Sequence, residues 1–247
     1  AVGRSALLSN TTGDRNVSIG TQALDANTTA DGNTAVGYDS LSANTGSELN
    51  VAVGFHALRL YNNTSGSGYN TAVGALAGDQ LTTGIQNTII GGLAGDALTD
   101  ADYNIAIGYA ALTMDTLGNR SVAIGYEALS TQNFTSATST YNVALGYNAG
   151  KVLTTGLQNT LIGGLAGDAI TTGSYNSAVG MSALGANTTG ASNTAVGQDS
   201  LSLNTTGANN VSLGAYTLDA NTTASNNTAV GYASLGANTT GAGNSAV

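Results

Sequence analysis

Five residues, Asn-Thr-Ala-Val-Gly at positions 33–37, recur along the whole chain and restrict it to a repetitive fold. Gly37 and Gly54 are 17 residues apart, and the same interval separates all neighbouring copies except two, where it is 20 and 21. A fixed period of this length is typical of stacked supersecondary units that bury their apolar faces against one another. The repeating glycines are Gly3, Gly20, Gly37, Gly54, Gly74, Gly91, Gly108, Gly125, Gly146, Gly163, Gly180, Gly197, Gly214 and Gly231.

The composition favours a thin, repeated core over a deep globular one. Of the 247 residues 35 are Gly, only 5% are aromatic, and Trp, Pro and Cys are absent. Burial therefore has to be shared by many similar coils. We predict an all-β fold, a parallel β-solenoid of about 14 coils that runs as a single repetitive array over residues 1–247. Because the chain opens and closes inside a repeat, we expect it to be a fragment of a longer fibre.

Each coil is numbered from its anchor asparagine at position 0, so that Asn33 is followed by Thr34 at +1, Ala35 at +2 and Val36 at +3. Positions +1 and +3 are mostly β-branched and lie on the same side of an extended segment. This pattern predicts a short strand with its larger side chains inside the coil and its alanine outside. Since an outward ladder of alanines is unfit for water, we expect a second surface to pack closely against it.

Two nearly invariant positions predict structural roles. The glycine at +4 suits a corner where φ is positive or where another backbone lies too close for a Cβ. The asparagine at 0 is expected to hydrogen-bond to its copies in adjacent coils, and only Ser121 interrupts the series. The structural residues are exemplified by Gly37, Gly54, Gly108, Gly125, Asn33, Asn104 and Asn142.

After the corner, a small residue at +7 and a leucine at +8 predict a second short strand, and Asn-Thr-Thr-Gly sequences predict the return turn. Two adjacent pairs of coils replace the +8 leucine by glycine and carry an apolar residue at +11 instead. These pairs create a longer period, because residues 70–103 and 142–175 match at 22 of 34 positions. The tyrosines that flank the pairs are Tyr69 and Tyr103, then Tyr141 and Tyr175.

Two coils, residues 50–69 and 121–141, are longer than the others and concentrate aromatic side chains. Insertions in repeat arrays form loops on one face, and that face is often the one that binds. We therefore predict that these coils contact a host-surface glycan or protein; the alternative is that they only decorate the fibre. The candidate contact residues are Phe55, His56, Arg59, Tyr61, Tyr69, Tyr126, Phe134 and Tyr141.

Charge and composition exclude several classes of partner. Five Lys and Arg against 14 Asp and Glu give a net charge of −9, which leaves no basic surface for nucleic acid. No apolar run approaches the roughly 20 residues of a membrane span, so we expect no membrane insertion by this segment. The absence of Cys excludes disulfides and thiolate metal ligands.

We expect no catalytic, cofactor or metal site. Asp79 and Asp96 occupy equivalent positions of adjacent coils and could share a cation, but Lys151 stands at that position in another coil. Solvated surface carboxylates are therefore the better interpretation. His56 has a carboxylate and a serine one coil away, yet no Gly-x-Ser-x-Gly turn accompanies them. The sequence thus predicts a protein that is not an enzyme.

Residues 121–125, Ser-Val-Ala-Ile-Gly, with relatives at 104–108 and 142–146, resemble the head repeats of YadA-like trimeric autotransporter adhesins. They are equally similar to the Asn-Thr-Ala-Val-Gly-Tyr-x-Ala-Leu repeats of phage tail fibres, which residues 227–235 follow except for a serine at the alanine position. This resemblance implies a left-handed β-roll, three copies of which pack side by side as a homotrimer used in adhesion. The sheet face with the +2 alanines is then the expected contact between copies.

Three functions are open at this point. The first is a surface adhesin head that mediates attachment, and the second is the shaft or tip of a viral tail fibre. The third is a self-assembling structural filament without a specific receptor. All three place the chain outside the cell, on a cell surface or a virion, with copies of itself as partners.

Overall fold

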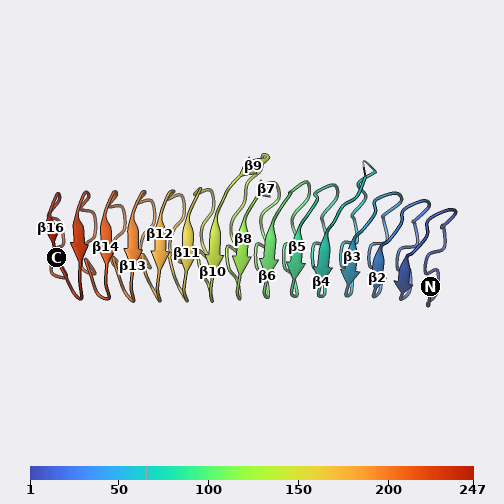
Figure 1. Ribbon diagram of the computed structural model, residues 1–247, viewed down its shortest axis with the longest axis horizontal. Coiled ribbons are helices and arrows are strands. Elements are labelled where there is room, and N and C mark those ends of the chain that lie inside the picture. The colour runs from blue at the N-terminus through green and yellow to red at the C-terminus, as the bar shows by residue number, and fades with distance from the viewer. Residues whose placement is uncertain (65) are drawn as a thin grey trace. The chain divides into compact units, whose positions relative to one another are not determined.

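The computed structural model describes residues 1–64 and 66–247, and these residues form strands and turns but no helix. They group into two compact units, one of residues 1–121 with 133–139 and one of residues 122–132 with 140–247. Within each unit short parallel strands follow one another in chain order, as the row of arrows in Figure 1 shows. The predicted all-β parallel solenoid is confirmed, whereas a single array over the whole chain stays a prediction.

In the described part of the first unit, three-residue strands of consecutive coils pair in parallel, and two shorter strands from its longer loops form a separate parallel pair. The main strands are β1 (Val17–Ile19), β2 (Thr34–Val36), β3 (Val51–Val53), β4 (Thr71–Val73), β5 (Thr88–Ile90) and β6 (Ile105–Ile107). The separate pair is β7 (Gly118–Asn119) and β9 (Thr138–Ser139).

The second unit repeats the same arrangement, with each strand bonded to the strand of the next coil. Its strands are β8 (Val122–Ile124), β10 (Val143–Leu145), β11 (Thr160–Ile162), β12 (Ser177–Val179), β13 (Thr194–Val196), β14 (Val211–Leu213), β15 (Thr228–Val230) and β16 (Ser245–Ala246). Ala178 pairs with Ala195, so identical coil positions stack on one another. The described strands delimit about 13 coils with a 17-residue spacing, whereas about 14 were predicted. The difference arises because the prediction counted repeat units, and a coil is the interval between two successive units.

The side chains of each strand face opposite to the sequence prediction. Ala35, Ala52 and the other +2 residues are buried inside the coil, except for the half-buried Ala246 of the last strand, whereas most +1 and +3 residues are partly exposed on its outer side. The inward direction predicted for the larger side chains is therefore wrong, and so is an outward alanine ladder as the contact between copies. The physical reason is the narrow coil, whose interior must also hold a buried +8 leucine such as Leu41.

The coils with larger +2 residues show how tight this interior is. Ile89 and Leu161 are fully buried at +2. A Cβ on Gly78 would lie 3.0 Å from Cδ1 of Ile89, and a Cβ on Gly150 would lie 2.7 Å from Cδ1 of Leu161. The glycine at +8 thus makes room for the larger side chain at +2, and apolar residues at +11 complete the core as predicted. These fully buried residues are Leu81, Leu98, Leu153 and Ile170.

The segment after the corner is a turn rather than the predicted second strand. Its +6 and +8 residues have left-handed backbone, as in His56 with φ 57° and Leu58 with φ 50°. It still bonds between coils, since the N–H of Leu24 donates to the carbonyl of Ser40 at 3.0 Å. Sequence reasoning missed this turn because leucine seldom adopts positive φ, so its pattern here indicated an extended segment.

The anchor asparagines form the predicted ladder of amides. The N–H of Asn50 donates to Oδ1 of Asn33 at 2.9 Å, and Nδ2 of Asn50 donates to the same oxygen at 3.2 Å. A bond to the return turn closes the coil, as from Nδ2 of Asn104 to the carbonyl of Gly118 at 2.9 Å. Because these groups are buried, each bond avoids the cost of an unsatisfied amide.

An overlong coil compensates for the one break in this ladder. Ser121 has no amide oxygen to offer to the next anchor, Asn142. In the second unit Nδ2 of Asn142 instead donates to Oε1 of Gln132 at 2.9 Å, and Gln132 belongs to the coil of residues 121–141. Part of the extra length therefore has a structural role.

The corner glycines are required by both conformation and space. Gly37 has φ 140°, and a Cβ there would lie 2.2 Å from the carbonyl oxygen of Gly54 in the next coil. Gly125 has φ 136°, and its Cβ would lie 2.2 Å from the carbonyl oxygen of Gly146. Contacts this short with backbone atoms cannot be relieved by rotating a side chain, so the predicted need for glycine is confirmed.

Candidate functional site

The strands of each unit present a continuous outer face, which we define as the side chains at +1 and +3. In the second unit this face is made of Val, Ile, Leu, Thr and Ser and carries no charged residue. The +3 position is apolar in every strand from β8 to β15. Its most exposed members are Leu145 at 44%, Val179 at 36%, Val196 at 38% and Leu213 at 37%. A regular apolar face of this kind is a candidate surface for protein contact.

A second candidate is a cluster at the +5 and +6 corner of the first unit. The ring of Phe55 stacks on Tyr38, with centroids 5.6 Å apart, and on His56, with centroids 3.9 Å apart. His56 Nε2 lies 3.6 Å from Oδ2 of Asp39. Ser40 is fully buried and donates to the carbonyl of Gly37 at 3.2 Å, so it does not join His56 and Asp39 in a triad.

Arg59 neutralises one carboxylate of this corner. Its Nε donates to Oδ1 of Asp79 at 2.7 Å and its Nη2 donates to Oδ2 at 2.9 Å, a bidentate pair of the strong kind. Hydrogen bonding to Asp79 raises the pKa of the Arg59 guanidinium. His56 Nδ1 is a further 3.9 Å neighbour of Asp79. The carboxylate of Asp79 is therefore paired with the Arg59 guanidinium.

The other carboxylates in the +9 column are partly buried beside the turn. Burial is the main cause that raises the pKa of Asp25, Asp96 and Asp168 above 3.8. Thr113 donates a hydrogen bond to Asp96, and Lys151 pairs with Glu127 at 2.6 Å rather than with Asp168. Among residues 1–64 and 66–247, no three His, Cys, Asp or Glu side chains are placed so that they could hold a metal ion.

The predicted contact residues divide into exposed and buried sets. Tyr61 is fully buried at +11, where its hydroxyl accepts a bond from Oγ of Ser47 at 3.3 Å and where burial raises its pKa. Phe134 is also buried, at 8% exposure. These two rings fill the interior of the overlong coils and are removed from the exposed contact set. The exposed or half-buried candidates are Phe55, His56, Arg59, Tyr69, Tyr126 and Tyr141.

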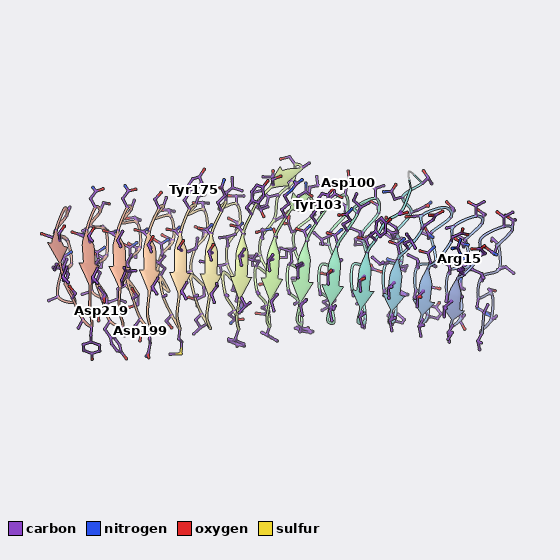
Figure 2. The ribbon with its side chains drawn as sticks, viewed as in Figure 1. Arg15, Asp100, Tyr103, Tyr175, Asp199 and Asp219 are labelled. Carbon is purple, nitrogen blue, oxygen red and sulfur yellow. The ribbon has the colours of Figure 1, made fainter. Side chains whose placement is uncertain are left out.

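Two matching rows of exposed side chains lie at position −1, directly before the anchor asparagines. The first unit carries Tyr69, Gln86 and Tyr103 in three consecutive coils, and the second carries Tyr141, Gln158 and Tyr175 in the same order. We call these the tyrosine rows. In Figure 2 Tyr175 lies at the return-turn edge of the second unit, opposite Asp199 and Asp219. Of these side chains, the overlong coils predicted only Tyr69 and Tyr141 as contact residues. The match between residues 70–103 and 142–175 was the sequence signal for the glutamines and for the second tyrosine of each row.

Comparisons with protein-family models, with curated proteins and with solved structures find no match. Within the described ranges, no helix has the length and apolar character needed to cross a membrane. The outer face and the tyrosine rows are therefore the two surfaces that bear on function.

Proposed function

We propose that this chain is a segment of an extracellular attachment fibre whose copies assemble side by side as a homotrimer through the outer face. The exposed apolar +3 positions carry this proposal. Strands about 10 Å long and about 4.8 Å apart give the outer face of the second unit an area of roughly 400 Å², of which the apolar +3 row is a part. Exposed apolar patches of a few hundred Å² are often contact sites. Burial of this face would contribute about 25 cal/mol per Å² to assembly.

A second copy of the chain is the partner that best matches this face. Its side chains repeat with each coil, about every 4.8 Å, and a copy offers the same repeat in return. The face also lacks charge, as the centres of protein interfaces do. The number of three copies follows the resemblance to adhesin heads and tail fibres.

Attachment is assigned to the edges of the solenoid that such assembly would leave open. Exposed aromatic rings at these edges, among them Tyr69, Tyr126 and Tyr141, supply contact area at low entropic cost. In this proposal the chain acts by surface contact, outside the cell, without catalysis or a cofactor.

Sedimentation of paired variants tests the assembly. Val179→Glu with Val196→Glu places two charges on the outer face, and we expect this variant to sediment with the mass of a single chain. Thr189→Glu with Thr206→Glu adds the same charges at exposed turn positions of neighbouring coils and should keep the assembled mass. The proposal fails if the wild-type chain sediments as a monomer, or if the outer-face variant retains the assembled mass with unchanged strand content.

A further inference from the structure

The tyrosine rows repeat the same three residues in the same order in each unit. The exposed fractions are 54% for Tyr69 and 41% for Tyr103, and 53% for Tyr141 and 56% for Tyr175. The glutamine between each pair is also exposed. The same side chains are therefore presented twice by the chain, each time in three stacked coils.

The backbone at these positions favours other residues. Tyr69 has φ 51°, Gln86 has φ 58° and Tyr103 has φ 61°, all in the left-handed region. That region suits Gly and Asn far better than Tyr or Gln. Other coils place Asn209 and Gly32 at the same position, and Arg15, Leu49 and Arg120 also occupy it with positive φ. What distinguishes the rows is the order of ring, amide and ring in three consecutive coils, which occurs once in each unit.

The spacing of each row suits a ligand that spans two coils and lies over the glutamine. Coils rise by about 4.8 Å, so the two tyrosines of a row start about 9.6 Å apart with the glutamine between them. A ring in contact with both would need roughly 7 to 8 Å, since carbon atoms pack best at about 3.5 to 4.0 Å. The backbone N–H groups of Gln86 and Gln158 donate to the carbonyls of Gly68 and Thr140 at 2.8 Å. Among the described residues, their side-chain amides form no hydrogen bond and so can donate and accept toward a ligand.

The first unit also supports one tyrosine from its far side. Arg120 follows Tyr103 at the −1 position of the next coil, and its guanidinium carbon lies 4.9 Å from the ring centroid of Tyr103. Arg120 is itself held by a bond from Nη1 to Oγ of Ser139 at 2.7 Å. This cation–π contact covers one face of the ring and helps to fix its position.

From this arrangement we propose that the tyrosine rows are two equivalent sites for sugar residues of a neutral polysaccharide. A pyranose has a face of C–H groups, which the electron-rich face of a tyrosine ring attracts, and an edge of hydroxyls, which a glutamine amide can bind. The net charge of −9 disfavours an anionic glycan. This inference rests on the proposed attachment function and names the class of its receptor.

Saturation-transfer NMR and affinity electrophoresis on the full chain test the sites, with neutral β-glucan, β-galactan and β-xylan oligosaccharides as probes. We expect at least one of these probes to bind the wild type. Tyr103→Ala with Tyr175→Ala, which removes one ring from each row, should weaken that binding at least tenfold. Tyr103→Phe with Tyr175→Phe keeps the rings and should bind within about threefold of the wild type. Gln86→Ala with Gln158→Ala should weaken binding by a smaller factor.

Tyr109→Ala with Tyr232→Ala is the matched control, because it removes one exposed tyrosine per unit at the +5 corner. This control should bind as the wild type does. Failure of the wild type to bind any neutral oligosaccharide, binding of a proline-rich peptide alone, or an equal loss in the control overturns the inference. Sedimentation separates the two proposals: an assembled chain that binds no sugar contradicts only the sites, whereas a monomer contradicts the assembly.

Discussion

At the scale of single residues, the fold depends on backbone conformations that most side chains avoid. The +4 glycines have φ between 113° and 144°, and the +6 and +8 residues alternate into the left-handed region in coil after coil. Leu24, Leu41 and Leu58 accept positive φ while fully buried. Strain of this kind persists only where the surrounding structure enforces it, and here the same constraint recurs in each neighbouring coil.

The corner should therefore be less tolerant than other glycine positions. Gly37→Ala places a Cβ 2.2 Å from a carbonyl oxygen at φ 140°, and we expect it to lower the free energy of unfolding by about 3 kcal/mol or more. Gly46→Ala is the control, because its Cβ would meet only Oγ1 of Thr29 at 3.9 Å. Urea denaturation monitored by circular dichroism measures both. Equal losses in the two variants would show that the corner has no special requirement.

Asp168 gives a prediction on pH. Burial raises the pKa of its carboxyl above 3.8, so the folded state holds this proton more tightly than the unfolded chain does. The stabilisation by the protonated form is fully present below 3.8 and is lost as pH rises through the folded-state pKa. Asp168→Asn removes that loss and should raise the melting temperature at neutral pH. The gain should disappear well below pH 3.8; a gain that is the same at both pH values contradicts this assignment.

At the scale of the coil, a few positions exchange volume with one another. The residues at +2, +8 and +11 together fill the interior. In one type of coil the large Ile89 at +2 is combined with Gly78 at +8 and Leu81 at +11. In the other type the small Ala35 at +2 is combined with Leu24 at +8 and a buried asparagine at +11. Both combinations bury their side chains fully although the residues differ. The two coil types are thus alternative ways to fill the same narrow space.

This exchange predicts a coupling between Ile89 and Gly78. Ile89→Ala removes a fully buried side chain and should cost about 2 to 5 kcal/mol, whereas Thr88→Ala on the outer face should cost less than about 1 kcal/mol. Gly78→Ala should destabilise the wild type, since its Cβ would lie 3.0 Å from Cδ1 of Ile89. In the Ile89→Ala background the loss caused by Gly78→Ala should be smaller, although the φ of 60° and Cδ2 of Leu58 at 3.1 Å still oppose the added methyl. Additive effects in the double-mutant cycle would contradict the shared space.

The sequence predicted the coil period, the parallel stacking, the glycine corner and the asparagine ladder. Each of these depends on a backbone conformation or on an amide hydrogen bond, and the repeated Gly and Asn residues indicate both directly. It failed on the direction of the strand. Side-chain size suggested that Val36 points inward and Ala35 outward, but the inner space of a narrow coil admits only the alanine. Of the candidate contacts, Tyr61 and Phe134 were misplaced for a related reason, since the extra length of their coils is partly used to bury them.

At the scale of the whole molecule, assembly is determined by which side of the strand meets a partner. A +2 residue faces the coil interior, its +3 neighbour belongs to the proposed contact between copies, and the return turn remains in water. These three environments differ in access and in proximity to a second chain. Single introduced cysteines can distinguish these environments, because the chain has no Cys of its own that would react.

Single cysteines at adjacent positions provide the most direct measurement, by thiol labelling and by non-reducing electrophoresis of the native protein. Ser212 is fully buried at +2, Leu213 is 37% exposed at +3, and Thr206 is exposed in the return turn. We predict that Ser212→Cys neither labels nor cross-links, that Thr206→Cys labels without cross-linking, and that Leu213→Cys is protected from label and forms disulfides between copies. Rapid labelling of Leu213→Cys without cross-linking would contradict assembly through the outer face, and labelling of Ser212→Cys in the folded chain would contradict the inward direction of +2.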